Sequence, residues 1–315
     1  GSQIPTTPRG ITMSHKDVIL RDLTLDGCTN QVVGTGSGIR LEKGWIENVR
    51  ITRIQQKNTG GHQSAVGLYM NGGTATNVVI DNCSCPSSYG NTQGIGAMVG
   101  GGLLVDSEVR DIKLNRGELH GIGVNVTGGT VRRVKITNVR GLAWSNTYGS
   151  GLYVGGSGTA EDCEIRGCLQ GVYIDGGTLR NSLIVGNDNN GSDKHAGGLW
   201  QGGGTVVNCT CADNETTQED ANSDFLASAG TTVNTIAIKA NVSGGTRRNN
   251  CFNEPVAFKR GYHLKGNANP CVNAGDNTMW AGVENPKDLD GNARIRGRIV
   301  DLGCYEFGVM GLMLL

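Results

Sequence analysis

The sequence predicts an all-β fold: a single-stranded right-handed parallel β-helix of about nine turns with a C-terminal capping segment. Three observations carry this prediction. A short pattern recurs along most of the chain, apolar and polar residues alternate with a period of two inside it, and the 315 residues include 52 glycines but only 6 prolines. Recurrence every 20 to 50 residues is typical of solenoids, and abundant glycine suits tight corners between strands.

Each repeat starts at a glycine, as in "GTLRNSLI" (177–184). The eight glycines are at positions 44, 73, 102, 129, 158, 177, 204 and 245. The spacings, by subtraction, are 29, 29, 27, 29, 19, 27 and 41 residues, and an earlier line, "VILRDLTL" (18–25), precedes them. The seventh position after the glycine is apolar, as in Ile51, Ile80 and Ile136, and polar residues flank it. This alternation indicates strands rather than helices. Irregular turn lengths favour a parallel β-helix over a strict hexapeptide repeat.

The fourth position after each glycine is almost always an amide or a carboxylate. Eight of the nine residues there are Asn or Asp: Asp22, Asn48, Asn77, Asp106, Arg133, Asp162, Asn181, Asn208 and Asn249. Because these groups donate and accept hydrogen bonds, we expect a ladder of buried side chains, each bonded to its neighbour one layer away.

The predicted organisation is a solenoid over 1–264, with an insertion at 215–235, and a cap or tail over 265–315 packed on the last turn. A cap is expected because the bare end of a solenoid exposes unpaired strand edges. The segments "NPCVNAGDN" (269–277) and "DLDGNARIRGRIVDLGCYEF" (288–307) resemble the C-terminal signature of secreted bacterial right-handed β-helix repeat proteins, which include polysaccharide-lyase-like and polymorphic outer-membrane-protein-like chains. The resemblance implies a secreted or cell-surface location and contact with carbohydrate, but no particular reaction.

Charge limits the classes of binding partner, and cysteine spacing limits the kinds of metal site and disulfide. With 28 basic and 28 acidic residues the formal net charge is zero, which disfavours nucleic acid and anionic membranes as partners. No apolar run is long enough to span a membrane, and we expect a monomer. The ten cysteines lack the spacing of a zinc site and are interpreted as small apolar residues of the stack. The disulfide to test is Cys271–Cys304.

One outward-facing column of the strand before each glycine is rich in aromatic residues. The column reads Arg40, Tyr69, Met98, Asn125, Tyr153, Tyr173 and Trp200. Its neighbours on either side, such as Val172 and Ile174, already supply the core. Aromatic residues that stack only on one another, or that loops cover, would explain this column structurally. The functional interpretation is a platform for sugar rings, with Arg40, Tyr69, Asn125, Tyr153, Tyr173 and Trp200 contacting substrate.

The sequence therefore predicts an extracellular protein that engages a polysaccharide in a groove. Cleavage by a lyase needs a base, a cation that neutralises a uronate carboxylate, and an acid. The candidate catalytic residues are His195, Lys194, Asp175 and His120, with a lyase favoured over a glycoside hydrolase. Asp188 and Asp193, in "DNNGSD" (188–193), are candidate calcium ligands. The alternative is a non-catalytic surface passenger or adhesin-type β-helix.

Overall fold

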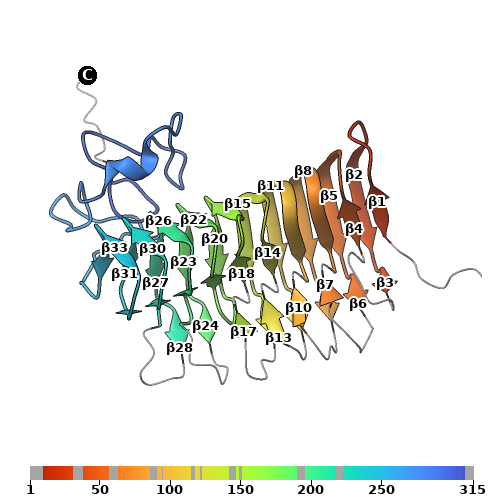
Figure 1. Ribbon diagram of the computed structural model, residues 1–315, viewed down its shortest axis with the longest axis horizontal. Coiled ribbons are helices and arrows are strands. Elements are labelled where there is room, and N and C mark those ends of the chain that lie inside the picture. Colours follow the sequence, from red (N-terminus) through yellow and green to blue (C-terminus); the bar gives the residue numbers. More distant parts are fainter. Residues whose placement is uncertain are drawn as a thin grey trace, which may run out of the picture.

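The computed structural model describes residues 10–30, 38–56, 63–64, 66–85, 91–93, 95–114, 118–120, 123–141, 147–148, 151–189, 196–216 and 223–308. Over these ranges the chain is a solenoid whose strands pair in parallel, turn upon turn (Figure 1). This confirms the predicted all-β parallel β-helix. Among the described residues the one helical element is the short 3-10 helix η1 (Asn277–Trp280).

Each turn contributes strands to three faces, which we call faces 1, 2 and 3 in chain order. Face 1 is built from β1 (Ile11–Met13), β4 (Ile39–Leu41), the first parts of β8 (Leu68–Asp81) and β11 (Ala97–Arg110), β14 (Val124–Val126), β18 (Leu152–Val154), β21 (Val172–Ile174), β25 (Leu199–Gln201), β29 (Phe225–Ala227) and β32 (Ala240–Val242).

Faces 2 and 3 follow the glycine corner. In the early turns one strand spans both: β2 (Ile19–Asp26), β5 (Trp45–Thr52), the later parts of β8 and β11, and β15 (Thr130–Thr137). In later turns this long strand is replaced by two shorter strands, one on each face. Face 2 then continues with β19 (Thr159–Glu161), β22 (Thr178–Arg180), β26 (Thr205–Val207), β30 (Thr231–Val233) and β33 (Thr246–Arg248). Face 3 continues with β20 (Glu164–Arg166), β23 (Leu183–Val185), β27 (Thr210–Ala212), β31 (Ile236–Ala237) and β34 (Cys251–Phe252).

Short strands complete the turns along the lower edge of Figure 1. They form three further parallel sheets: β3 (Thr29–Asn30), β6 (Gln55–Gln56), β9 (Ser84–Cys85), β12 (Lys113–Leu114) and β16 (Arg140–Gly141); β7 (Gln63–Ser64), β10 (Asn91–Gln93), β13 (Glu118–His120) and β17 (Thr147–Tyr148); and β24 (Asp188–Asn189) with β28 (Glu215–Thr216).

Within the described residues, face 1 contains ten strands in succession, one more than the turn count that the spacing predicts. The additional turn consists of β29, β30 and β31, which lie largely inside residues 215–235, the range predicted to be an insertion. The segment "GTTVNTIA" (230–237) carries the repeat pattern and was missed. The 41-residue spacing therefore divides at Gly230 into 26 and 15 residues.

The corner between faces 2 and 3 explains the Asn and Asp column. All nine predicted positions have φ between 49° and 57°, and Asn234, in the additional turn, has φ 55°. Asn and Asp tolerate this left-handed conformation better than other residues with a side chain. The column therefore turns the backbone, and the expectation of a uniformly buried ladder is wrong: Asp22, Asn48, Asn77 and Asp106 are exposed because the corner points outward.

Neighbouring corner side chains still contact each other. The Asn48 amide donates to Asp22 at 3.0 Å, Asn77 donates to Asn48 at 2.7 Å, and Asn181 donates to Asp162 at 2.6 Å. Only Asn181, Asn208 and Asn234 are fully buried. These three lie under the C-terminal segment, which we define as residues 254–308.

The interior changes character along the axis. It is filled by Ile, Val, Leu and Cys through most turns, then becomes polar and hydrogen-bonded near the C-terminal end. Asn187 donates to Asn214 at 2.9 Å, and Asn214 donates to Asp224 at 2.9 Å. In the last turn, Arg247 donates to the carbonyl oxygens of Gly230 and Gly244. Polar side chains of the solenoid itself therefore fill its end, and most of their bonds go to one another or to backbone carbonyl oxygens.

The C-terminal segment packs along the outer side of face 3 rather than only on the last turn (Figure 1). In register, the outward positions there are Glu108, Lys135 and Glu164, then Leu183, Thr210, Ile236 and Cys251. The change from charged to mostly apolar side chains at Leu183 marks the surface that the segment covers. Cys304, Tyr305, Leu302 and Leu264 pack there, whereas Ile299 is 41% exposed.

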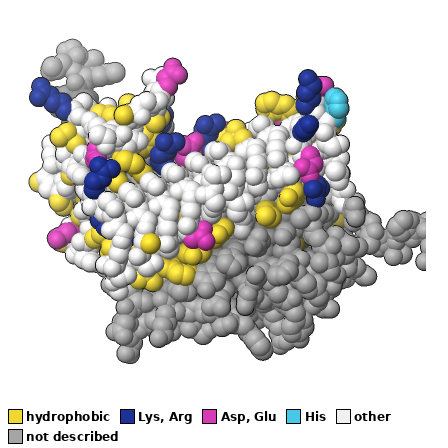
Figure 2. Space-filling model, in the orientation of Figure 1, with side chains coloured by type: hydrophobic (Ala, Val, Ile, Leu, Met, Phe, Trp, Pro, Cys, Tyr) yellow, Lys and Arg dark blue, Asp and Glu magenta, His cyan; other side chains and the backbone are white. Residues whose placement is uncertain are grey.

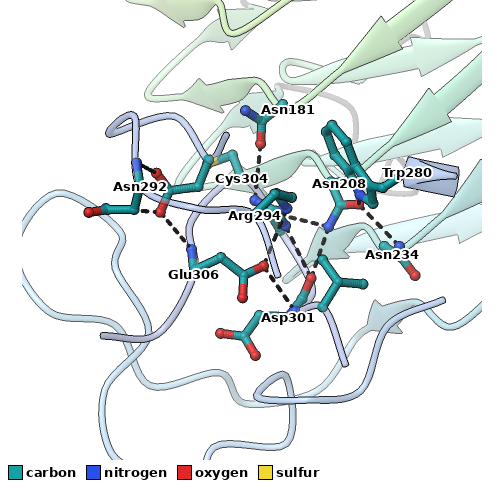
Figure 3. Close-up of polar contacts among 12 residues, drawn as sticks. Asn181, Asn208, Asn234, Trp280, Asn292, Arg294, Asp301, Cys304 and Glu306 are labelled. Carbon is teal, nitrogen blue, oxygen red and sulfur yellow. Dashed lines mark hydrogen bonds and ion pairs between the residues drawn. The ribbon is translucent and has the colours of Figure 1, made fainter. Parts of the chain in front are cut away.

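A buried arginine organises the polar half of this contact (Figure 3). Arg294 is fully buried and donates to the Asn181 side chain at 3.0 Å and to the carbonyl oxygens of Asp301 and Gly303 at 3.1 and 2.5 Å. Its Nε lies 3.3 Å from a carboxylate oxygen of Glu306. Burial raises the pKa of Glu306 to about 8, although Arg294 opposes the shift.

Candidate functional site

The predicted aromatic column lies in register on face 1. Strand pairing aligns Arg40, Tyr69, Met98, Asn125, Tyr153, Tyr173 and Trp200 in that order. The residues before and after each of them, such as Val172 and Ile174, are fully buried in the core. The column side chains other than Asn125 are partly exposed. Face 1 therefore presents the outward row that the sequence predicts.

Three rings of this row form a continuous stack. The ring centroids of Tyr173 and Trp200 lie 4.2 Å apart with an interplanar angle of 23°. Those of Tyr153 and Tyr173 lie 5.6 Å apart at 41°. Since parallel strands are spaced about 4.8 Å apart, the rings face one another along the solenoid axis. From Tyr153 to Trp200 the rings therefore contact one another through their faces, and their edges point outward.

A polar pair borders the stack. The hydroxyl of Tyr153 donates to the Asp175 carboxylate, with both carboxylate oxygens at 2.9 Å. Partial burial and, to a smaller extent, this hydrogen bond raise the pKa of Tyr153 well above its ordinary value. Asp175 itself is exposed. The site therefore combines apolar ring edges, a phenol hydroxyl and an accessible carboxylate.

Two glycines make room for the tyrosine rings. A Cβ placed on Gly155 would lie 2.6 Å from the hydroxyl oxygen of Tyr153, and one on Gly202 would lie 3.0 Å from that of Tyr173. Both rings therefore lie close over the backbone of face 1. Larger residues at these positions would displace the rings, so the glycines are part of the site's local structure.

The other predicted substrate contacts lie apart from this stack. Arg40 forms an ion pair with Glu42 at 2.5 Å, and its guanidinium lies 4.8 Å from the ring centroid of Tyr69. Asn125 is only 1% exposed, so it is part of the packed face rather than an open contact. The geometry thus concentrates the candidate site on Tyr153, Tyr173, Trp200 and Asp175.

Several predicted residues lie outside the described structure. Lys194, His195 and Asp193 fall in the gap between 189 and 196, and for His120 the structure describes only its place in β13. The turn of β13 and β14 lies two layers before Tyr173. The carboxylate of Asp188 lies 3.6 Å from the guanidinium of Arg140. No group of three His, Cys, Asp or Glu among the described residues is arranged to hold a metal ion.

The border of the C-terminal segment was not predicted as a site. Two clefts of about 280 and 290 Å³ lie between this segment and β15, β19 and β20. Figure 2 shows charged side chains gathered beside the segment. The first cleft is lined by Lys135, Glu164, Asp290 and Tyr305 among others. The adjacent His263 ring stacks on Tyr305 and lies 2.7 Å from Asp290. The apolar outward residues after Leu183 are the sequence signal that would have located this border.

The comparisons with known proteins add one structural likeness. No protein-family model matches the chain, and no curated protein matches it. Among solved structures, the crystal structure of pectate lyase Pel9A matches with a TM-score of 0.43 and 13% sequence identity, over 94% of this chain and 88% of that chain. The fold assignment given above rests on the strand pairing itself. Within the described residues no helix is long and apolar enough to cross a membrane.

Proposed function

We propose that this chain is an extracellular polysaccharide-engaging protein that binds a glycan along face 1, over β18, β21 and β25. The observation that carries the proposal is the Tyr153–Asp175 hydrogen bond beside the exposed edge of the ring stack. Sugars are amphipathic: C–H groups contact aromatic rings, and hydroxyls bond to carboxylates and phenols. A strip that is apolar along one side and polar along the other complements such a ligand.

The stacked geometry defines how a sugar would lie. Because Tyr153, Tyr173 and Trp200 turn their faces to each other, a glycan contacts the row of ring edges rather than a flat floor. Ring edges carry partial positive charge and attract hydroxyl oxygens. The Asp175 carboxylate accepts hydrogen bonds from sugar hydroxyls. An extended glycan parallel to the solenoid axis meets all three rings, one layer after another.

Cleavage is the second part of the proposal. Asp175 is the carboxylate of the described site, and the other proposed catalytic groups are Lys194 and His195, which lie between β24 and β25 in the sequence, and His120 in β13. In a lyase, Lys194 would neutralise a uronate carboxylate and His195 would remove the adjacent proton. The calcium hypothesis concerns Asp188, in β24, and Asp193, which lies between β24 and β25 in the sequence.

A second candidate function is a structural surface passenger, and a specific observation favours it. The Tyr173–Trp200 stack at 4.2 Å is the contact expected if the rings merely extend the packing of face 1. In that case the rings stabilise the fold and bind no sugar. The two functions differ in whether the wild-type protein binds any glycan.

The test is a glycan array probed with wild type and with Asp175→Asn. The amide oxygen of the variant still accepts the Tyr153 hydrogen bond, so folding is preserved while the charge is removed. Binding of defined glycans by wild type, weakened several-fold in Asp175→Asn, supports the proposal. Absence of binding to every glycan supports the passenger function. For cleavage, glycans that bind are incubated with wild type and His195→Ala, and ultraviolet absorbance of an unsaturated product is followed.

A further inference from the structure

The end of the solenoid and the C-terminal segment run side by side at one place that contains two cysteines. Cys251 lies in β34, the last strand of face 3, and Cys271 lies in the C-terminal segment. The Asn249 amide donates to the carbonyl oxygen of Ala274 at 3.1 Å, and Arg248 pairs with Asp276 at 2.8 Å. These two contacts hold 248–249 against 274–276, immediately beside the two cysteines.

The two thiols meet inside a buried apolar cluster. Cys251 is 7% exposed and Cys271 is fully buried, and both belong to the cluster that contains Ile236, Leu264 and Leu302. The interaction between the two side chains lowers the pKa of Cys251 and raises that of Cys271. In the structure all ten cysteines are free thiols. The pairing differs from the Cys271–Cys304 bridge considered from the sequence, because Cys304 packs in a separate cluster with Leu183 and Tyr305.

We propose that Cys251 and Cys271 form a disulfide that joins the last turn of the solenoid to the C-terminal segment. The bond closes a loop of about 20 residues, a length for which cross-linking restricts the unfolded chain considerably. It would hold the segment against face 3 in addition to the Arg294 contacts. Structural disulfides persist in oxidising compartments, so this covalent link is consistent with the extracellular location proposed above but does not depend on glycan binding.

The chemistry requires an external oxidant, a small-molecule disulfide such as oxidised glutathione. Cys251 is the more exposed of the two thiols, at 7% against 0%, and its interaction with Cys271 lowers its pKa, so Cys251 is the attacking thiolate. Its sulfur forms a mixed disulfide and expels one small-molecule thiolate. The Cys271 thiolate then attacks the Cys251 sulfur, forming the S–S bond and releasing the second small-molecule thiol. Two protein S–H bonds are lost, and the oxidant accepts the two electrons and two protons.

The experiment compares the full chain after refolding in a glutathione redox buffer and after complete reduction. Both samples are denatured and alkylated, and their intact masses are measured by mass spectrometry. Of the ten cysteines, eight should be alkylated in the oxidised sample and ten in the reduced one. Peptide mapping without reduction should recover the peptide containing Cys251 linked to the one containing Cys271. Ten alkylated thiols in the oxidised sample, or a Cys271–Cys304 peptide, would overturn the proposal.

A second measurement links the bond to the fold. Oxidised wild type should melt several degrees higher than reduced wild type, with slower hydrogen exchange in 254–308. Cys251→Ala with Cys271→Ala should show no difference between oxidising and reducing buffers. Cys28→Ala, which removes a partly buried thiol of the first turn, is the matched control and should retain the difference. Equal melting of oxidised and reduced wild type would also contradict the assignment.

Discussion

The Arg294 contact gives the sharpest prediction about what holds the C-terminal segment in place. Arg294→Met keeps an unbranched side chain of similar length but removes the guanidinium. Its three hydrogen bonds are then lost. The Asn181 side-chain oxygen loses this donor, whereas the carbonyl oxygens of Asp301 and Gly303 still accept from the Asn208 amide at 2.9 and 3.2 Å. An unsatisfied buried acceptor costs about 1–3 kcal/mol, and each hydrogen bond lost from a charged donor costs about 1.5–3 kcal/mol. Allowing for relaxation, we expect undocking of the segment to become easier by about 4 kcal/mol at pH 6.

The pH is part of this design. At pH 6 the Glu306 carboxyl holds its proton, because burial raises its pKa to about 8. The loss at pH 6 therefore reports on the three hydrogen bonds of the guanidinium and not on an ion pair with Glu306. At pH 9 the carboxylate is ionised, and removing Arg294 leaves a buried charge without its partner, so the cost should be larger. A second substitution, Glu306→Leu, should recover much of that additional loss, since a buried ion pair replaced by apolar residues is often tolerated.

Hydrogen exchange measures the effect locally. The amides of Gly275, Leu289 and Leu302 are bonded within the segment, to the carbonyl oxygens of Val300, Cys304 and Cys271. A loss of about 4 kcal/mol corresponds to exchange roughly a thousand-fold faster at these amides. Amides of β18 should be unaffected and serve as the internal control. If the three amides exchange within a factor of three of wild type, the guanidinium does not hold the segment and the reasoning is wrong.

Two further predictions concern the same region. Glu306 has a folded pKa raised from 4.5 to about 8, so its stabilising contribution is complete below pH 4.5 and is lost as pH rises through 8. Glu306→Gln should therefore flatten the fall in segment stability between pH 5 and pH 9, as followed by Trp280 fluorescence. An unchanged slope would mean that another group titrates. Asn234→Ala should cost about 3 kcal/mol in urea unfolding, because it loses the left-handed corner preference and the bonds to Asn208 and Asp276. The exposed corner variant Asn77→Ala should cost about 1 kcal/mol, and equal costs would mean that docking adds nothing at Asn234.

The fold was predictable because the repeat reports backbone geometry directly. A strand alternates with a period of two, and the same spacing returns in each turn, so Ile51, Ile80 and Ile136 identify the core without any tertiary information. The Asn and Asp column was found for a reason other than the true one: its residue types match a left-handed corner as well as a hydrogen-bonded ladder. Sequence pattern alone does not distinguish these two demands.

The docking of the C-terminal segment could not be derived in the same way. It depends on contacts between residues far apart in the sequence, such as Arg294 with Asn181, 113 positions apart, and Trp280 with Asn208, 72 positions apart. No periodicity links those pairs. A local signal did exist, since the outward position of face 3 changes from Glu164 to Leu183. Likewise the aromatic column was predictable in register, but the orientation of its rings depends on side-chain torsions that the pattern does not encode.

The most direct test of the central claim is calorimetric titration of a glycan that the array identifies. The compared proteins are wild type, the double variant Tyr173→Ala with Trp200→Ala, and Trp45→Ala, which removes a 52% exposed aromatic ring from face 2. If the ring stack binds the glycan, the double variant should bind tens-fold more weakly, about 2 kcal/mol, and Trp45→Ala should bind as wild type does. A double variant that remains folded by circular dichroism and binds with wild-type affinity would contradict the assignment of the site to face 1.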